Sequence, residues 1–281
     1  MSTGGALPGN DVEVLVNQVQ SYLNSLARST MHLTRDDRPE TFTMHQREWA
    51  LLDEVFAPIY SPSSDISLHF LNLVGETAAP RSGSFLEIGC GTGIISVHGA
   101  LAGYERVVAA DINECAVENT RLNADRHGVS DRVTALRSDL FASLDPQDRF
   151  DTIFWSSNYV LAPTDYEYGS VHERAYMDAG YRAHRGYLSE AVDHLTGTGS
   201  ALLHFSSRGD IPLLRKIAAE CGRELRTLES RTVVEGQDVV EHMLLEITPA
   251  RTRKGGRPFT PRNRAEARVT PARQARSRTL R

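Results

Sequence analysis

Short apolar segments that alternate with helix-patterned segments limit this chain to few folds. Between residues 84 and 221 the segments typical of strands are separated mainly by segments with helical spacing. Such alternation indicates a parallel sheet with helices on both faces, and Gly236 predicts a closing hairpin. We therefore predict an α/β fold with a doubly wound, seven-stranded, mostly parallel sheet. The predicted strands span 84–88, 106–110, 133–138, 150–155, 201–206, 226–235 and 241–248, and the predicted helices span 66–74, 93–102, 113–127, 180–195 and 211–221.

The segment before this alternation has a different pattern. Residues 11–29 have apolar side chains at helical spacing, and residues 42–60 fit either a hairpin or a short helix. We predict an N-terminal helical extension at 1–58 that forms one wall of a substrate site. Residues 59–250 then form the sheet-containing domain.

Charge divides the chain into two parts. The net charge is −5, but residues 251–281 carry 11 Lys and Arg against one acid, which leaves −15 on residues 1–250. We predict that 251–281 is a basic, disordered tail, because it has too few apolar residues to offset its ordering entropy. We favour a solubilising role for it over a specific contact with a polyanion. The acidic remainder is not typical of a protein that binds nucleic acid specifically.

The remaining composition indicates a cytoplasmic protein. The three cysteines, Cys90, Cys115 and Cys221, have no CxxC spacing, so we expect neither a disulfide framework nor a metal site. No apolar run is long enough for a transmembrane helix, and the first residues do not resemble a secretion signal.

A glycine-rich turn follows the first predicted strand of the sheet. Glycines at 89, 91 and 93 allow tight turning and close approach of a ligand to the backbone. A turn of this kind suits dinucleotides and other ligands alike. The dinucleotide pattern GxGxxG, however, requires glycine at Ile94, and the carboxylate of Glu87 suits a cationic ligand better than a pyrophosphate.

Two further acids end the next two predicted strands. Asp111 lies 22 residues after Gly89, where a carboxylate can accept hydrogen bonds from both ribose hydroxyls. Asp139 is placed to accept from an adenine amino group, with Leu140 packed beside the ring. The three strand-end acids predict an adenosine site without phosphate recognition.

This set of motifs resembles the class I S-adenosylmethionine-dependent methyltransferases, over roughly residues 59–248. The family pattern ExGxGxG, followed by acids at the ends of the second and third strands, is met here. The resemblance implies a Rossmann-like methyltransferase fold and S-adenosyl-L-methionine as cofactor. The cofactor-binding residues that it implies are Glu87, Gly89, Cys90, Gly91, Gly93, Asp111, Ile112, Asn113, Asp139, Leu140 and Ser156.

A narrower resemblance is to the HemK-like N5-glutamine methyltransferases. The segment IYSPSSD at 59–65 is similar to their YxPxxDT, and residues 111–120 are similar to their DINpxAVxNT. The strand FDTIFWSSNYV aligns with their FDlIvsNPPYV. In that family the Asn of NPPY holds the target amide and the Tyr packs on the same plane.

The acceptor motif of this chain departs from the family pattern. Ser156 stands at the Asn position, Ser157 and Asn158 replace both prolines, and Tyr159 matches the Tyr. Ile66 also replaces the family's cofactor-contacting Thr. Without the prolines the backbone geometry of the motif cannot be assumed, and Asn158 is able to replace the missing Asn only if the loop turns differently. The predicted catalytic residues are Ser156, Asn158 and Tyr159.

The segment 161–185 is long and rich in aromatic and charged residues, so it is either a substrate lid or a solvated helix start. If a general base is needed, the candidates are Tyr159, Asp165, His172 and Glu173, although we favour an exposed loop position for His172. Arginines of this segment are candidates for a carboxylate clamp. They are Arg174, Arg182 and Arg185.

The altered acceptor motif leads us to expect methyl transfer to nitrogen or oxygen of a small polar molecule, with neither a membrane nor a specific nucleic acid as partner. The alternatives are a protein-glutamine methyltransferase of the release-factor type and a non-catalytic module that binds the cofactor. The short region before residue 59 points away from a release factor. An NAD-dependent enzyme is a further alternative, against which Ile94 counts.

Overall fold

The computed structural model describes residues 9–76 and 78–250. The predicted basic tail at 251–281 lies outside the described residues, so its disorder stays a prediction. Within the described ranges no helix combines the length and apolarity that crossing a membrane requires. The cytoplasmic location also stays a prediction.

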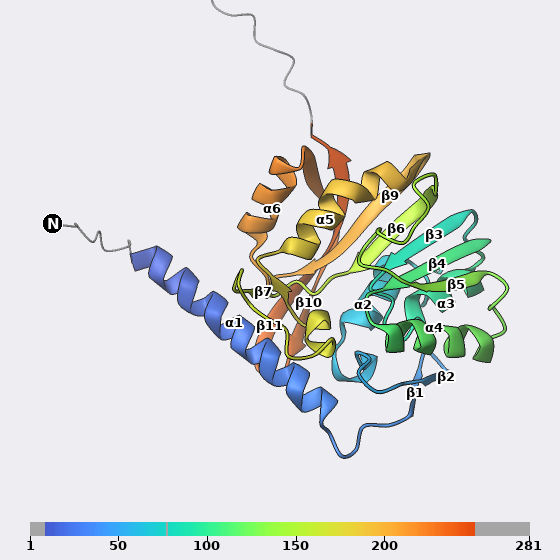
Figure 1. Cartoon of the computed structure of the whole chain (residues 1–281), viewed down its shortest axis with the longest axis horizontal. Coiled ribbons are helices and arrows are strands. Elements are labelled where there is room, and N and C mark those ends of the chain that lie inside the picture. The colour runs from blue at the N-terminus through green and yellow to red at the C-terminus, as the bar shows by residue number, and fades with distance from the viewer. Residues whose placement is uncertain (1–8, 77, 251–281) are drawn as a thin grey trace, which may run out of the picture. The chain divides into compact units, whose positions relative to one another are not determined.

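Seven strands form one sheet in the order β10-β11-β9-β6-β3-β4-β5 (Figure 1). Neighbouring strands from β9 to β5 are parallel, and β11 is antiparallel to both of its neighbours. The predicted doubly wound, mostly parallel sheet is therefore confirmed. Its strands are β3 (Ser84–Ile88), β4 (Arg106–Asp111), β5 (Val133–Arg137), β6 (Phe150–Ser156), β9 (Leu195–Ser206), β10 (Arg223–Glu235) and β11 (Asp238–Pro249).

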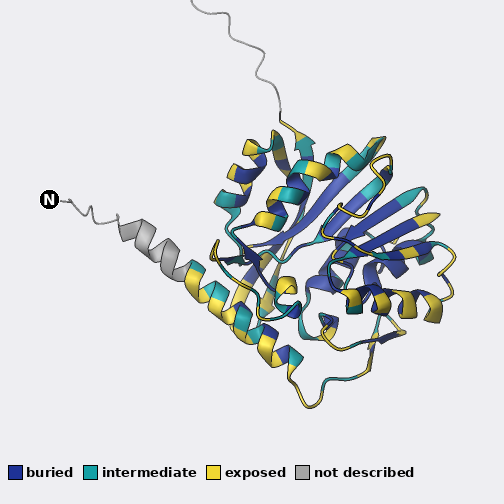
Figure 2. Ribbon diagram, in the orientation of Figure 1, coloured by how far each residue is buried: buried dark blue, intermediate teal, exposed yellow. Residues whose placement is uncertain are grey.

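Helices cover both faces of this sheet, and the strands between them are mostly buried (Figure 2). One core cluster joins the sheet to the helices α2, α3 and α4, and the other joins it to α5 and α6. Those helices are α2 (Ser63–Phe70), α3 (Ile94–Ala102), α4 (Glu114–Arg126), α5 (Arg182–Glu190) and α6 (Ile211–Glu220). The long helix α1 (Gly9–Leu33) runs outside these layers, past the short strand β7 (Leu161–Ala162), which pairs with β8 (Asp178–Ala179) (Figure 1).

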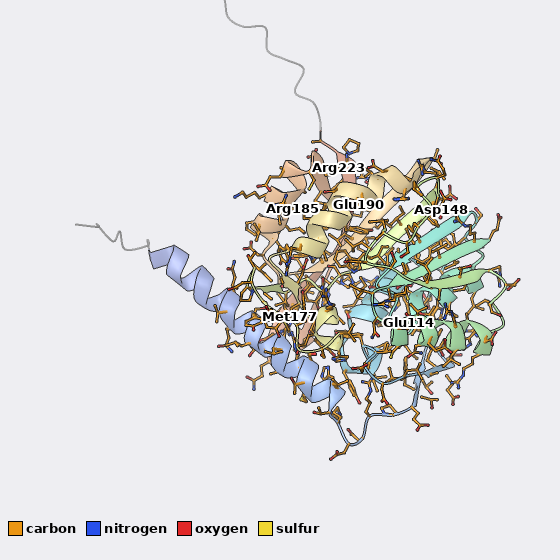
Figure 3. All side chains as sticks on the ribbon, viewed as in Figure 1. Glu114, Asp148, Met177, Arg185, Glu190 and Arg223 are labelled. Carbon is orange, nitrogen blue, oxygen red and sulfur yellow. The ribbon has the colours of Figure 1, made fainter. Side chains whose placement is uncertain are left out.

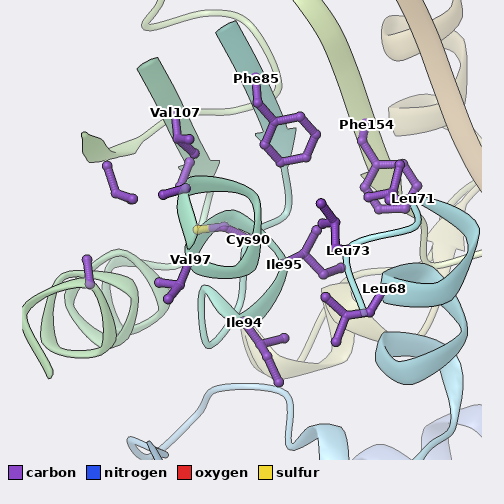
Figure 4. Packing of buried hydrophobic residues seen from close by; sticks show 14 of the residues in the cluster. Leu68, Leu71, Leu73, Phe85, Cys90, Ile94, Ile95, Val97, Val107 and Phe154 are labelled. Atoms are coloured by element: carbon purple, nitrogen blue, oxygen red, sulfur yellow. The ribbon is translucent and has the colours of Figure 1, made fainter. Parts of the chain in front are cut away.

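Adjacent residues of the central strands belong to opposite cores. Phe85 and Phe154 pack toward α2 and α3 (Figure 4), whereas Leu86 and Ile153 pack toward α5. Side chains alternate between the two faces of a strand, so a strand covered on both sides needs apolar residues at every position. This explains why the central strands are visible in the sequence as continuous apolar runs.

The strand β9 begins earlier than the sequence predicts. Residues 195–200 were expected to end a helix, but Leu195 already pairs with Phe150 of β6, and the register shifts before Thr152 pairs with Ser200. A Cβ at Gly199 would lie 2.7 Å from the Phe150 carbonyl oxygen. Gly199 therefore permits close backbone contact in an irregular strand, and the TGTGS segment does not mark a loop. The preceding helix correspondingly ends early, with α5 at Glu190 and a short 3-10 turn, η3 (Ala191–His194).

Residues 41–50 form a hairpin of β1 (Thr41–Met44) and β2 (Arg47–Ala50), which settles the choice that the sequence left open. The two turn residues, His45 and Gln46, both have positive φ angles, 49° and 61°. A two-residue hairpin turn of this type normally carries Asn-Gly or Asp-Gly. The usual sequence signal for the hairpin is therefore missing.

Two buried asparagines of α4 attach this hairpin to the main domain. Asn119 donates to the carbonyl of Ala50 at 2.8 Å and accepts from the N–H of Leu52 at 2.8 Å. Asn123 accepts from the N–H of Ala50 at 2.7 Å and donates to the Thr92 carbonyl at 2.9 Å. Because both amides are fully buried, their hydrogen bonds fix the hairpin next to the glycine-rich turn.

Candidate functional site

The glycine-rich turn lies between β3 and α3. Gly89, Gly91 and Gly93 all have positive φ angles, 67°, 52° and 75°, which side chains other than glycine rarely adopt. At Gly93 a Cβ would also come within 2.9 Å of the Thr120 Cα, so glycine allows α4 to pack closely. At Gly91 a Cβ would meet no atom within 4 Å, and this residue lines a large cavity. The turn therefore offers open backbone to a ligand in that cavity.

Glu87 is the acid at the base of the turn, and its side chain is almost fully buried. Burial raises the pKa of Glu87 to about 8, although the hydrogen bonds from the side chain and backbone of Ser96 act in the opposite direction. The residue also lines the cavity. A buried carboxyl without a basic partner is suited to receive a cationic group of a ligand.

Asp111 at the end of β4 is fixed by the two loops around it. One carboxylate oxygen accepts from the N–H of Gly91 at 2.9 Å, and the other accepts from the N–H of Asn113 at 2.9 Å. Desolvation raises the pKa of Asp111, and the backbone N–H donors oppose the rise. Asn113 caps α4 by accepting from Cys115, while Ile112 and Asn113 both line the cavity.

Asp139 and Leu140 line the cavity after β5. Asp139 is exposed, and Leu140 has a positive φ of 50°. The hydroxyl of Ser138 donates to the Leu140 carbonyl at 2.8 Å and accepts from the Ser143 N–H at 3.0 Å, which pins this turn. Ten of the eleven residues predicted to bind the cofactor therefore line one cavity. The exception is Gly93, which packs against Thr120 of α4.

All four residues of the acceptor motif line the cavity, but their polar groups have different hydrogen-bond partners. Ser156 lines the cavity, and its hydroxyl lies 3.1 Å from the hydroxyl of Ser67. Ser157 donates to the His204 carbonyl at 2.8 Å, so its hydroxyl is occupied by the β9 backbone. Tyr159 also lines the cavity, and burial raises its pKa to about 12.

Asn158 has a side-chain orientation set by the backbone. The Nδ2 atom of Asn158 donates to the carbonyl of Arg174 at 2.7 Å and to the carbonyl of Met177 at 2.9 Å. Figure 3 shows Met177 beside α1. The reverse orientation would place the amide oxygen against two carbonyl oxygens. In the described part of the chain, Asn158 Oδ1 is buried and has no hydrogen-bond partner, and the residue Asn158 belongs to the cavity lining. An unpaired acceptor is costly inside a protein, so it points to a donor on a ligand.

The second wall of the cavity comes from segments far away in the sequence. The cavity has a volume of about 890 Å³, and its lining includes Ser25, Arg28 and His32 of α1 together with Phe56 and Tyr60. Residues 166–176 complete this wall and contribute aromatic rings. Arg28 was not singled out in the sequence, because the apolar spacing of residues 11–29 is that of an ordinary amphipathic helix.

The expectation that His172 is exposed is wrong. It lies in the 3-10 turn η2 (His172–Ala175), is 1% exposed, and bonds to the hydroxyl of Ser29 at 2.9 Å. Burial lowers its pKa to about 4, so it is neutral near pH 7. Glu173 accepts from Tyr166 and the Gly169 N–H, which makes it part of the loop structure, and Asp165 does not line the cavity.

The three candidate arginines are divided between two places. Arg174 and Arg182 line the cavity, and the Arg174 guanidinium stacks over the Tyr168 ring. Arg185 pairs with Glu220 at 2.6 Å instead, and Figure 3 shows it on the α5–α6 side. Ile66 is buried in the core rather than at the cavity, which its neighbours Ser63 and Ser64 line.

Comparisons with known proteins agree with this geometry. Residues 62–195 match the family described as ribosomal protein L11 methyltransferase (PrmA). A putative protein N5-glutamine methyltransferase of Methanocaldococcus jannaschii is 34% identical over 107 residues, 38% of this chain and 50% of the relative. A release factor glutamine methyltransferase of Rhodopirellula baltica is 39% identical over 87 residues, 31% of this chain and 29% of the relative. These matches support a class I S-adenosylmethionine-dependent methyltransferase.

Among solved structures, the 16S rRNA N2 G1207 methyltransferase of T. thermophilus, in complex with AdoMet and guanosine, shares the fold. Its TM-score is 0.52 at 20% identity, over 75% of this chain and 50% of that one. Our chain spans half or less of the length of the curated relatives that it matches.

The matches also correct one expectation. The sequence led us to expect a small-molecule substrate and no specific nucleic acid. Most of the matched sequences are named instead for proteins, namely ribosomal protein L11 and a release factor, while two are named for cobalt-precorrin-6B. The physical reason for the error is that a degenerate acceptor motif shows a change at one point of contact, and it carries no information on the size of the substrate.

Proposed function

We propose that this chain transfers a methyl group from S-adenosylmethionine to the side-chain amide nitrogen of a glutamine in a protein. The observation that carries the proposal is the orientation of Asn158, a residue of the cavity lining whose amide oxygen is left without a hydrogen-bond partner. The Ser156 hydroxyl borders the same cavity. Two relatives named for glutamine methylation support the choice of acceptor, and the altered motif makes this a variant of the HemK-like pattern.

The chemistry explains why acceptors are needed. An amide nitrogen is a poor nucleophile because its lone pair is delocalised onto the carbonyl. When Asn158 Oδ1 and Ser156 Oγ accept hydrogen bonds from the two N–H groups of a glutamine amide, electron density moves toward its nitrogen. Alignment of that nitrogen is worth about 7–11 kcal/mol in favourable cases. The aromatic ring of Tyr159 offers a flat surface to hold the amide plane.

The residues around the glycine-rich turn fit the cofactor. Asp111 keeps lone pairs free beside its two backbone hydrogen bonds and would hold the ribose hydroxyls. Asp139 and Leu140 would hold the adenine, and the buried Glu87 would face the cationic end. S-adenosylmethionine, when bound, would supply a methyl group on a cationic sulfur: the amide nitrogen would form the new carbon–nitrogen bond as the carbon–sulfur bond breaks, the neutral thioether would leave, and one N–H proton would pass to solvent.

The test is methyl transfer from radiolabelled S-adenosylmethionine to four purified acceptors: a release factor, ribosomal protein L11, ribosomal RNA and tRNA. We expect label on a protein, and peptide mass spectrometry should place one methyl group on a glutamine side chain. Label on RNA alone would contradict the proposal. Calorimetric binding of S-adenosylmethionine without product from any acceptor would favour a non-catalytic module instead.

Two matched variants of adjacent residues sharpen the test. Asn158→Ala removes the unpaired acceptor, whereas Ser157→Ala removes a hydroxyl that is occupied by the β9 backbone. Labelling of the glutamine should fall sharply in the first variant and persist in the second. Equal loss in both would indicate damage to the loop rather than loss of an acceptor.

A further inference from the structure

The second half of α1 has polar residues on its buried side. Ser25, Ser29 and His32 are almost fully buried, and their spacing of three or four residues places them on one face of the helix. Three apolar residues of the same helix are instead about half exposed, namely Val19, Leu23 and Met31. A helix that only covers a core has the opposite pattern, so the polar face requires a reason other than packing.

Arg28 lies between these residues in the sequence and lines the cavity together with Ser25 and His32. Its Nη2 donates to Ser25 Oγ at 2.8 Å, whereas its Nε is buried and has no hydrogen-bond partner. The chain has 36 acidic residues, yet within the described ranges no carboxylate forms an ion pair with Arg28.

The arginines around Arg28 have partners of the expected kind. Arg38 donates to three backbone carbonyls. Arg35 pairs with Asp37 at 2.7 Å, and Arg208 pairs with two acids of the β10–β11 hairpin. Arg28 differs from all three, because its partner is a neutral hydroxyl of its own helix.

The surroundings do not neutralise the charge of Arg28. Burial lowers the pKa of Arg28, and the positive charge of Arg208 lowers it further. The negative charge of Glu235 acts in the opposite direction, but that carboxylate already lies 3.2 Å from Arg208 and 2.7 Å from His242 Nε2. A buried cation without a partner costs folding free energy, so it points to an anion that arrives with a ligand.

The neighbours of Arg28 place it at the acceptor end of the cavity. Tyr159 of the acceptor motif and Tyr176 of the second wall are both close enough to act on it electrostatically. Glu87 and Asp111, which we propose for the cofactor, act on each other instead. The anion therefore belongs to the acceptor rather than to the cofactor.

The charges that line the cavity favour a carboxylate over phosphates. Eight acidic residues and three arginines line it. A segment of RNA would bring several phosphates against this excess of negative charge. A side-chain carboxylate brings a single charge, and its two oxygens match the planar fork of one guanidinium.

We propose that Arg28 binds the side-chain carboxylate of an Asp or Glu that lies near the target glutamine in the acceptor protein. Arg28 thereby selects glutamines that have an acidic neighbour. The protein nature of the acceptor rests on the proposed function, whereas the unpaired state of Arg28 does not.

The first experiment needs no substrate. Arg28→Met removes the charge and keeps a long apolar side chain, whereas Arg208→Met breaks two ion pairs. In the ligand-free protein we expect the urea midpoint of Arg28→Met to rise by about 0.5 M and that of Arg208→Met to fall. A fall in Arg28→Met as large as that in Arg208→Met would overturn the proposal, because it would mean that the charge already has a stabilising partner.

The second experiment uses the protein that becomes labelled in the methyl-transfer test. Acids near its methylated glutamine are replaced by their amides one at a time. We expect one replacement to raise KM about tenfold at nearly constant kcat, as for loss of one charge-assisted hydrogen bond. Arg28→Met should raise KM equally with the unchanged acceptor and should show no further rise with the replaced one. Arg35→Met is the matched control and should resemble wild type, since Arg35 pairs with Asp37.

The outcomes separate this inference from the proposed function. Methyl transfer to a protein with a KM that Arg28→Met does not change, or with additive effects of the enzyme and acceptor variants, would overturn the carboxylate site alone. Label on RNA alone would overturn both proposals. A loss of affinity for S-adenosylmethionine in Arg28→Met, measured by calorimetry, would show that the guanidinium binds the carboxylate of the cofactor instead.

Discussion

The two halves of the cavity are built in different ways. The half that we propose for the cofactor is formed by Glu87, the glycine-rich turn and Asp111, which follow one another at successive strand ends of a parallel sheet. The acceptor half combines β6 with α1, η2 and the β10–β11 hairpin, which lie up to about two hundred residues apart in the chain. Local sequence controls the first half, and tertiary packing controls the second. Mutations should therefore damage the two halves with different signatures.

The largest effect should follow a substitution in the glycine-rich turn. Gly93→Val should lower the free energy of unfolding by about 4 kcal/mol and abolish cofactor binding, because a side chain there adds steric clash with Thr120 to backbone strain. Gly128→Val is the matched control, since Gly128 has a similar φ of 66° and no atom near its missing Cβ. In chemical denaturation the control should lose only the free energy of unfolding that backbone strain removes, about 1–2 kcal/mol. Equal losses would mean that close packing against α4 is unimportant.

Glu87→Gln should stabilise the protein and weaken cofactor binding at the same time. The folded-state pKa of about 8 is above the unfolded value, so the wild type loses stability as the pH rises from about 4.5 to about 8. The neutral amide avoids that loss, which is worth up to about 3 kcal/mol at pH 7. Urea denaturation at pH 5, 7 and 8.5, with calorimetry of S-adenosylmethionine, measures both effects. A variant that is less stable than wild type at every pH would contradict this assignment of Glu87.

On the acceptor side, Asn158→Ala should lower kcat about 100-fold, in the range seen when one preorganised hydrogen-bonding group is removed. The affinity for S-adenosylmethionine should stay within about threefold of wild type, because Asn158 is hydrogen-bonded to the 174–177 segment and not to the glycine-rich turn. Steady-state kinetics and calorimetry together provide the measurement. An equal loss of kcat and of the affinity for S-adenosylmethionine would contradict the separation of the cavity into two halves.

The smallest effect should come from the wall beside α1. Arg174→Ala should raise KM for the macromolecular acceptor about fivefold at nearly constant kcat, because Arg174 lines the cavity at the acceptor end. Arg185→Ala should leave KM unchanged, since Arg185 pairs with Glu220 outside the cavity. A larger change for Arg185 than for Arg174 would show that the acceptor approaches over α5 and α6.

The same comparison explains how far the sequence could predict the structure. The sheet and the cofactor motifs are local: buried strands need apolar residues at every position, and strand-end acids are brought together by the parallel arrangement itself. The hairpin at 41–50 was left undecided because its turn uses positive φ angles at His45 and Gln46. The burial of His172 was missed because it depends on Ser29, 143 residues away. The contact between His204 of β9 and His242 of β11 depends on strand register, which no single segment encodes.

The asparagine attachment of the β1–β2 hairpin has a practical consequence for anyone who shortens this protein. A chain that starts near residue 59 would keep α4 but lose Ala50 and Leu52, the partners of Asn119 and Asn123. Two polar amides would then face an empty groove directly behind Thr92 in the glycine-rich turn. We expect such a truncated chain to bind S-adenosylmethionine poorly even though every cofactor motif is still present, so residues 41–52 belong in any shortened version of this protein.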